Sequence, residues 1–406
     1  MKKKIVFAAC LIMLILIVFE ACKKLEPSAP KEDEVMDAPV DGLTHAQSKL
    51  FLDGANEFDE VYTTETGLGP IFVANSCGSC HGGDSRGHLF TALTRFGQSD
   101  TTGNQFLTSG APQIQNRAIL GHRPELVPSG ATSSKFLAPI ASGVGFLELV
   151  SDADLLAMSD PADANADGIS GVPNWKAIPS WVVPFSNAVT QSGKYICRFG
   201  RKAGAYNLHQ QTVGAFNQDM GVTSTFMSQN PYNYLEGLIS IPTADPEISD
   251  QGVNATVFYL QVLQAPVQRK QNDVTVQQGK QVFINTGCES CHKQTLKTGY
   301  SPVDGLSNKE FHPYTDLLLH DMGNGLDDHY TEGSAMTYEW RTTPLWGLGL
   351  APSSQGGHYF LMHDGRAHSI EEAITMHGGE STNSVTNYNA LSQSDRDALI
   401  KFLKSL

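Results

Sequence analysis

Two stretches of the chain combine a helix-start signal with apolar residues at helical spacing. Residues 44–47 read Thr-His-Ala-Gln, a capping-box pattern, and residues 275–278 read Thr-Val-Gln-Gln, a second one. After the first box, apolar side chains follow at roughly helical intervals: Leu50, Phe51, Phe58 and Val61. We therefore expect a helix near the start of each half of the chain.

Two further amphipathic stretches come late in the two halves. In residues 247–263 the apolar positions share one helix face, and Pro266 follows as a stop signal. Residues 394–406 are amphipathic through Leu399, Phe402, Leu403 and Leu406. The segments between these helices are rich in Gly, Pro, Asn and Ser, which predicts long ordered loops with short hairpins at most. We place a domain boundary between residues 266 and 273, giving an N-terminal domain over 43–268 and a C-terminal domain over 269–406.

The N-terminus has the pattern of an export signal. Three lysines precede an apolar run from Ile5 to Phe19, and Cys22 follows the small residue Ala21. This predicts a signal peptide over residues 1–21 and a lipidated Cys22 as the mature N-terminus. Residues 22–42 are polar, proline-containing and acidic, so we expect a flexible tether there.

The charge balance narrows the classes of partner. The 406-residue chain carries 28 Lys and Arg against 42 Asp and Glu, a net charge of −14, and loss of residues 1–21 makes it −16. Such an acidic protein is poorly suited to nucleic acid. A basic electron donor or a small neutral oxidant is compatible with this charge.

The segment 279–292 reads GKQVFINTGCESCH and ends in a Cys-x-x-Cys-His unit. Cys288 and Cys291 have the spacing that reaches two vinyl groups on one edge of a porphyrin, and His292 is placed to ligate its iron. The sequence therefore predicts a covalently attached haem c at this motif.

A second copy lies at 69–81, GPIFVANSCGSCH, with Cys77, Cys80 and His81. Phe72 and Phe283 each stand five residues before the first cysteine of their motif. A zinc site made of the four cysteines is the alternative, but zinc does not require a histidine after each pair. We expect two haems.

Export also fits the cysteines, because thioether attachment of haem is completed outside the cytoplasm. Cys197 has no partner left to pair with, so it is expected to be a small buried side chain. The four tryptophans are expected in the core: Trp175, Trp181, Trp340 and Trp346. Trp346 is the candidate for a bridge between the haems, because it is nearest to the motif residues.

The layout of early helix, haem motif and late helix resembles the cytochrome c fold. In that fold the N- and C-terminal helices cross above a haem held by the loop between them. The resemblance implies a mainly α protein made of two cytochrome c-like domains with long ordered loops.

The second half also resembles a family through its motifs. Residues 341–346 read RTTPLW, residues 360–366 read FLMHDGR and residues 369–377 read SIEEAITMH. This pattern is similar to that of the bacterial di-haem cytochrome c peroxidases. The closer match is the di-haem oxidoreductase branch once labelled predicted thiol oxidoreductases, through residues 167–171, 198–200, 219–224, 314–323 and 340–347.

The resemblance implies an axial ligand for the second haem. The peroxidases place a methionine about fourteen residues after the His-Asp-Gly histidine, and His377 stands at that position here. We predict that His377 ligates the second iron. Met362 and Met376 are the alternatives.

In the first half, residues 200–211 echo this pattern, but no histidine or methionine follows at the ligand position. The first iron is therefore expected to be open to peroxide. The resembling peroxidases line this face with a glutamine and a glutamate that move a proton. Gln211 and Asp219 fit that pattern with a spacing of eight, and Glu148 is an alternative acid. Structural roles for Gln211 as a cap and Asp219 as a loop anchor are the other reading.

Residues 163–169 read DANADGI, the first half of a calcium loop, with Asp163, Asn165 and Asp167 as oxygen ligands. Asn174 stands at the twelfth position, where an EF-hand has glutamate. The resembling peroxidases hold calcium between their domains. A calcium site and a turn rich in Asn and Asp are both compatible with this segment.

We expect a periplasm-facing, lipid-anchored di-haem c-type oxidoreductase that reduces peroxide, with electrons passing from haem 2 to haem 1. Its donor is expected to be a small redox protein of the cytochrome or cupredoxin type. The alternatives are a plain electron-transfer cytochrome, with both irons six-coordinate, and a di-haem oxidase that modifies another substrate.

Overall fold

A computed structural model describes residues 36–97, 104–110, 112–237 and 245–406. The predicted signal peptide and Cys22 lie outside these residues. In the described part of the chain, no helix is both long and apolar enough to cross a membrane.

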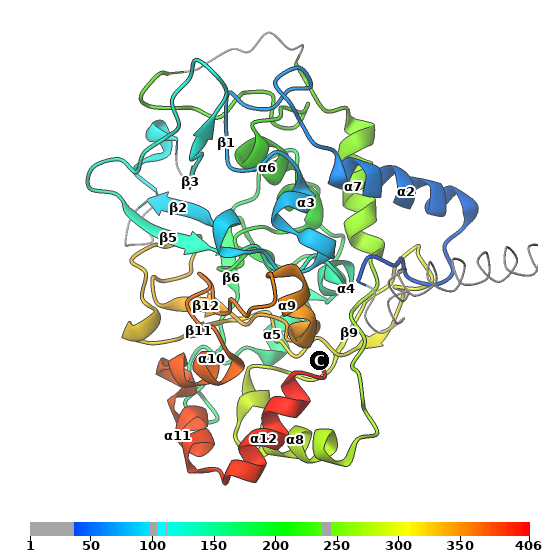
Figure 1. Cartoon of the computed structure of the whole chain (residues 1–406), viewed down its shortest axis with the longest axis vertical. Helices are drawn as coiled ribbons and strands as arrows, with labels where there is room; N and C mark the ends of the chain where they lie inside the picture. The colour runs from blue at the N-terminus through cyan, green and yellow to red at the C-terminus, as the bar shows by residue number, and fades with distance from the viewer. Residues whose placement is uncertain (1–35, 98–103, 111, 238–244) are drawn as a thin grey trace, which may run out of the picture. The chain divides into compact units, whose positions relative to one another are not determined.

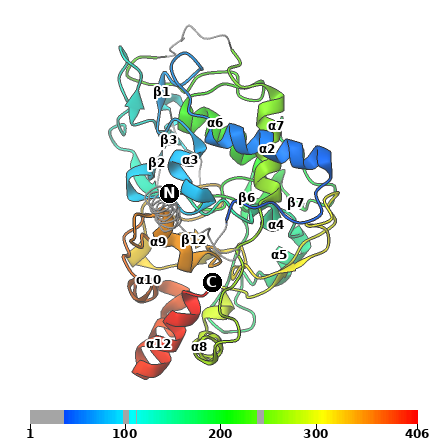
Figure 2. The same ribbon diagram turned by 45° about the vertical axis from the view of Figure 1, so that its right-hand side comes forward.

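An early helix and a late helix pack together in the first half. Helix α2 (His45–Asp59) is capped by Thr44, and the predicted capping box with Gln47 is confirmed. It packs against α7 (Asp250–Val262), and Figures 1 and 2 show the two helices side by side. The crossing is close because Gly54 of α2 has no side chain to separate the two backbones.

The second half repeats this helix pair. Helix α8 (Val274–Asn285) packs against α12 (Gln393–Leu403), as Figure 1 shows. The cap of α8 is Asp273, whose side chain accepts hydrogen bonds from the amides of Thr275 and Val276, so the predicted box at Thr275 is wrong. A carboxylate at the N-cap position satisfies the free amides of the first turn as well as a threonine does.

The remaining α-helices lie in the chain between the early and the late helix of each half; one has 13 residues and the others have nine or fewer. They are α3 (Cys77–Cys80), α4 (Val144–Glu148), α5 (Asp152–Met158), α6 (Leu208–Met220), α9 (Ala351–Ser354), α10 (Ile370–Met376) and α11 (Thr382–Ala390).

Small antiparallel sheets connect the helices. Two sheets have three strands, in the orders β3 (Gln113–Ile114), β2 (Leu93–Gly97), β5 (Thr132–Phe136) and β6 (Asn174–Lys176), β8 (Lys194–Cys197), β7 (Thr190–Gln191). Three are pairs: β1 (Ile71–Phe72) with β4 (Arg117–Ala118), β9 (Leu296–Lys297) with β10 (Glu310–Phe311), and β11 (Leu319–Asp321) with β12 (Glu339–Arg341). The mainly α prediction is therefore corrected to a mixed structure, because the long segments between helices pair locally to satisfy their backbone groups.

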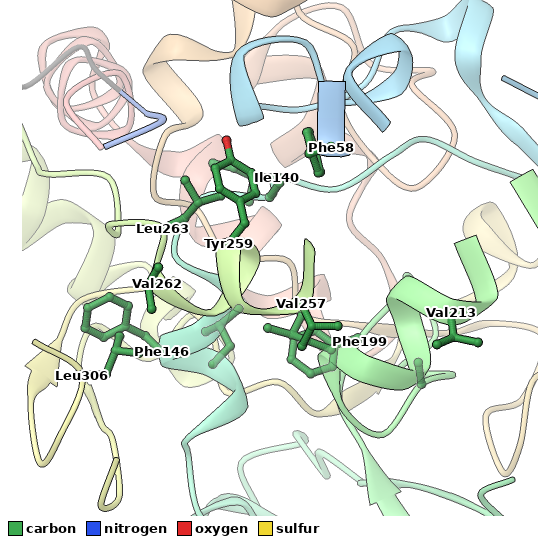
Figure 3. Close-up of a cluster of buried hydrophobic side chains, with 14 of the residues drawn as sticks. Phe58, Ile140, Phe146, Phe199, Val213, Val257, Tyr259, Val262, Leu263 and Leu306 are labelled. Carbon is green, nitrogen blue, oxygen red and sulfur yellow. The ribbon is translucent and has the colours of Figure 1, made fainter. Parts of the chain in front are cut away.

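The largest hydrophobic cluster is built around α2 and α7. Figure 3 shows Phe58, Val257 and Tyr259 of these helices in the same cluster as Leu306. Leu306 and Trp346 come from beyond residue 268, so this cluster draws on both sides of the predicted domain boundary. Residues 36–406 form one compact unit. The two-domain division stays a prediction about how the chain is organised.

The packed chain begins earlier than the predicted tether end at residue 42. Met36 and Val40 are buried, and the amide of Val40 donates to the carbonyl of Val262 over 2.8 Å. The apolar residues among the polar ones at 36–42 thus cover the end of α7.

Candidate cofactor and active sites

The second Cys-x-x-Cys-His motif opens onto a cavity. Cys288 lies three residues after the end of α8, and the cavity of about 220 Å³ is lined by Cys288, Cys291 and His292. The His292 Nδ1 lies 2.9 Å from the carbonyl oxygen of Tyr314. A carbonyl only accepts, so Nδ1 carries the proton and Nε2 keeps the lone pair that a metal needs. Burial lowers the pKa of His292 to about 4, which keeps the ring neutral.

His377 lines the same cavity and is prepared in the same way. It follows the last residue of α10, and its Nδ1 lies 2.6 Å from the carbonyl oxygen of Ala373. The pKa of His377 is lowered by burial, so this ring is also neutral with a free lone pair on Nε2. Two neutral imidazoles from different segments therefore face one cavity that also holds two thiols.

The two methionine alternatives differ in position. Met362 lines the cavity, whereas Met376 is 36% exposed and is not among the residues of the cavity wall. The geometry favours His377, because its ring is already oriented by the hydrogen bond to Ala373, and leaves Met362 as the alternative within the cavity.

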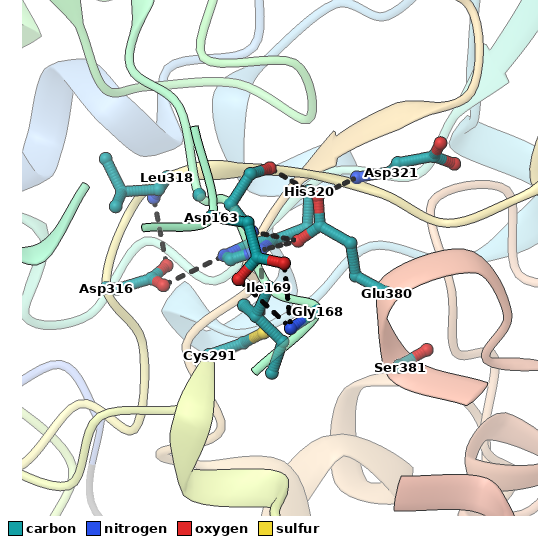
Figure 4. Close-up of polar contacts among 12 residues, drawn as sticks. Asp163, Gly168, Ile169, Cys291, Asp316, Leu318, His320, Asp321, Glu380 and Ser381 are labelled. Carbon is teal, nitrogen blue, oxygen red and sulfur yellow. Dashed lines mark hydrogen bonds and ion pairs between the residues drawn. The ribbon is translucent and has the colours of Figure 1, made fainter. Parts of the chain in front are cut away.

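A buried charged group borders the same cavity. Figure 4 shows His320 between Asp316 and Glu380, with Nε2 2.9 Å from Asp316 and Nδ1 2.7 Å from Glu380. Its Nδ1 is also 3.5 Å from the Cys291 sulfur. Burial lowers the pKa of His320, but the two carboxylates outweigh burial and raise it well above its usual value. A cationic imidazolium therefore stands beside the second motif.

The first motif forms the short helix α3 with His81 as its C-cap. Phe58 of α2 lies 6.1 Å from the His81 ring, just as Phe283 of α8 lies 6.5 Å from the His292 ring. The counterpart of Phe283 is therefore Phe58, and not Phe72, which lies in β1. Burial lowers the pKa of His81 to about 4.

The four motif cysteines do not meet. Across the described ranges, no group of three or more His, Cys, Asp or Glu side chains is close enough to hold a metal ion. The four-thiolate zinc alternative therefore has no site in this fold.

Asp219, in the last turn of α6, lies beside the first motif. Its carbonyl oxygen accepts hydrogen bonds from the amides of Val73 and Ala74, just before the motif. Its carboxylate accepts a 2.6 Å hydrogen bond from the Gln113 amide. Burial raises the pKa of Asp219 to about 6, although Gln113 and Arg95 act against it. Burial raises the pKa of Cys80 to about 12, and the charge of Asp219 adds to that effect.

The other two acid–base candidates lie in different surroundings. Gln211 has an exposed side chain, and eight residues along α6 separate it from Asp219, about 12 Å of helix. Glu148 is buried, and its carboxylate accepts hydrogen bonds from the amide of Leu208 and the side chain of Gln261. Those contacts hold the start of α6 against α7, which is a structural use of the carboxylate.

The predicted calcium loop uses its oxygens internally. Asp163 accepts from the amide of Gly168, Asn165 accepts from the amide of Asp167, and Asp167 accepts from the amide of Ile169. This is the pattern of a turn rich in Asn and Asp. Calcium binding at this loop stays a prediction.

Cys197 is 1% exposed, and burial raises the pKa of its thiol to about 12, as expected of a small buried side chain. Trp346 is also buried, in the largest cluster against Phe311. Trp340 lies in the cavity wall and stacks on His363 at 3.6 Å, which sequence reasoning did not anticipate.

Sequence reasoning also missed Gln113, which binds Asp219, and the three buried arginines of the cavity wall, Arg86, Arg201 and Arg341. Gln113 comes from β3 and carries no local signal. Arg201 lies in the stretch 200–211 and Arg341 in the stretch 341–346. Their positions in these two motif stretches were the signal that could have identified them.

Comparison with known proteins decides the family. The family described as "Di-haem oxidoreductase, putative peroxidase" matches residues 133–406. The chain belongs to this di-haem oxidoreductase family. The match contains the second motif and His377, and the first motif lies ahead of it.

No curated protein matches this di-haem oxidoreductase significantly. Among solved structures, it is similar to Kuenenia stuttgartiensis hydrazine synthase pressurized with 20 bar xenon, with 14% identity, coverage of 94% of this chain and 95% of that chain, and a TM-score of 0.40.

The residues present fit the haem groups that the family implies. The cavity at the second motif is lined by the two thiols and the imidazole of the motif, by the imidazole of His377 and by largely apolar side chains, which fits a haem with two histidine ligands. The first motif supplies two thiols and a neutral, partly buried histidine.

Proposed function

We propose that this di-haem oxidoreductase reduces hydrogen peroxide and carries both haems covalently. Cys77 and Cys80 would attach haem 1, Cys288 and Cys291 would attach haem 2, and His81 and His292 would ligate the irons. When bound, the haems supply the one-electron redox chemistry that the protein side chains lack.

The two sites suit different tasks. His292 and His377 line the same cavity as neutral rings with lone pairs on Nε2, so together they would close the second site to other ligands. A closed site favours electron entry over substrate binding. We therefore assign electron entry to the second motif and peroxide to the first.

The observation that carries the peroxidase assignment is the Asp219 carboxylate beside the first motif. Breaking the O–O bond requires a group that takes a proton from one oxygen and returns it to the other. A carboxylate with a pKa of about 6 does both near neutral pH. Gln113 fixes the orientation of this carboxylate through its 2.6 Å hydrogen bond.

The same proposal places the protein outside the cytoplasm. We propose that it faces the periplasm on a lipid anchor at Cys22, since haem attachment to cysteine is compatible with an exported protein. The net charge of −16 after removal of residues 1–21 suits a small donor with a basic face, such as a cytochrome or a cupredoxin.

Haem counting and peroxide turnover test the proposal together. The purified protein should carry two haems per chain, and replacing Cys77 and Cys80 by Ala, or Cys288 and Cys291 by Ala, should halve that number. Peroxide consumption with a reduced small redox protein should be lost in the first double variant. Two haems with no peroxide consumption and no spectral response to peroxide would identify an electron carrier instead.

A further inference from the structure

Three buried arginines converge on the cavity of the second motif. Arg86, Arg201 and Arg341 all line it, and each is at most 6% exposed. They come from three separate segments: Arg86 follows the first motif, Arg201 precedes α6, and Arg341 ends β12. The fold therefore gathers three fixed positive charges at one wall.

Each guanidinium is held on one side by neutral groups. Arg86 donates to the carbonyl oxygen of Pro344 over 2.7 Å, Arg201 to that of Leu137 over 2.8 Å, and Arg341 to that of Gly200 over 2.8 Å. A guanidinium has five N–H donors, so these contacts leave donors for a further ligand. The buried Nε of Arg86 has no partner among the described residues.

Two other arginines, the buried Arg198 and the partly buried Arg95, show what is missing here. Arg198 is paired with the buried Asp152, and Arg95 with Glu332. In the described part of the chain, no carboxylate lies within ion-pair distance of Arg86, Arg201 or Arg341. The acidic groups whose charges act on Arg341 and Arg201 are paired elsewhere, Asp316 with His320 and Asp364 with Arg366.

The three charges also repel one another. Burial lowers the pKa of Arg201 to about 9, and the charges of Arg86 and Arg341 contribute in the same direction. Burying charges without a counter-charge costs several kcal/mol per ion. An anion bound against the cluster would offset this cost.

We propose that Arg86, Arg201 and Arg341 form the carboxylate-binding site for the propionate groups of the haem attached at Cys288 and Cys291. This inference rests on the proposed haem attachment at the second motif. The ligand class follows from the geometry, because a planar guanidinium fork matches a carboxylate, and the cavity that the arginines border also contains both thiols.

The assignment has a consequence for the haem potential. A positive charge near the haem favours the reduced state, because reduction removes one positive charge from the iron. Replacing Arg201 or Arg341 by Gln should therefore shift the low-spin haem to a lower midpoint potential. It should also make the potential depend on pH between 5 and 8, since a propionate without its guanidinium titrates at higher pH.

Redox titration of the intact, haem-loaded protein at several pH values tests this, after haem content has been measured. Arg341→Lys keeps the charge and should retain most of the wild-type potential. Arg366→Gln is the matched control, because Arg366 is near His363 but is already paired with Asp364. That variant should leave the potential unchanged.

Several results would overturn the proposal. One is an unchanged potential in both Gln variants accompanied by a loss of stability in urea, which identifies a purely structural cluster. Another is a shift confined to the other haem. A third is a shift of the wild-type potential on addition of phosphate that is as large as the shift caused by the substitutions. That result identifies a site for free anions.

The outcome is separable from the peroxidase assignment. Two attached haems that do not react with peroxide overturn the peroxidase alone, because no step of the titration uses peroxide. Absence of haem from the second motif overturns both proposals.

Discussion

Gly54 in α2 is the structural counterpart of Gly279 in α8. A Cβ added at Gly54 would lie 2.1 Å from the carbonyl oxygen of Ala255, and one added at Gly279 would lie 2.0 Å from that of Ala398. Each glycine thus allows an early helix to touch the backbone of a late helix. The two halves of the chain are built on the same close crossing.

The first prediction is that Gly279→Ala destabilises the protein by about 1–3 kcal/mol, because α8 and α12 must separate to admit the methyl group. Urea unfolding of the wild type and the variant measures this change in the free energy of unfolding. Gly214→Ala is the control, since Gly214 lies inside α6 with nothing within 4 Å of its added Cβ. That change should be stabilising by up to about 1 kcal/mol. Equal effects of the two substitutions would contradict a role for the close crossing.

The second prediction concerns His377. His377→Gly should convert the low-spin haem of the second motif to high-spin, because it removes an oriented neutral imidazole from the cavity. Absorption and electron-spin spectra of the ferric protein measure the change. Met376→Leu, at an exposed position, should leave both spectra as in the wild type.

A low-spin signal that survives in His377→Gly would give the ligand role to another side chain. Met362 is then the first candidate, because it lines the same cavity. The double variant with Met362→Leu would decide between them.

The features readable from sequence were those encoded locally. The capping box at Thr44, the two Cys-x-x-Cys-His motifs and the late amphipathic helices each depend on residues close together in the chain. The internal echo was also local: Phe199 bridges to Ala205 ahead of α6, and Leu361 bridges to Ala367 ahead of α10.

What sequence reasoning missed depends on contacts between distant segments. Gln113 meets Asp219 across more than a hundred residues, and Arg86 reaches the carbonyl oxygen of Pro344 across 258. Equal spacing of Phe72 and Phe283 from their cysteines was misleading, because a longer loop in the first half separates α2 from its motif. The strand pairs are two to five residues long, too short to show an alternating pattern.

The third prediction is that the contribution of His320 to stability depends on pH. The pKa of His320 is raised well above 6.5 in the folded state, so its pairing with Asp316 and Glu380 is fully stabilising below 6.5. This stabilisation is lost as pH rises through the folded pKa. His320→Gln should cost about 3–5 kcal/mol at low pH, and the difference from the wild type should shrink at alkaline pH.

Urea unfolding of both proteins at a series of pH values measures this difference. His329→Gln is a matched control, because His329 also lies beside a carboxylate, Asp327, but its side chain is 71% exposed. It should change stability little at any pH. A constant difference between wild type and His320→Gln across the series would show that pairing with Asp316 and Glu380 does not raise the pKa of His320.

The last prediction is that Asp219 sets the pH dependence of peroxide turnover. Its pKa of about 6 means that the carboxylate form, which accepts the first proton, predominates only above that pH. The kcat/KM for peroxide should therefore rise through about pH 6 and level off. Asp219→Asn should lower turnover about a hundredfold and remove the rising limb, with both haems still attached.

Gln113 supplies the discriminating variant for that prediction. Its hydrogen bond lowers the pKa of Asp219, so Gln113→Ala should move the rising limb to higher pH while both haems stay attached. If Asp219 only anchors the segment before the first motif, Asp219→Asn should instead reduce stability and haem retention together with activity. In that case Gln113→Ala should leave the shape of the pH profile unchanged, because no titrating group of the reaction would have been altered.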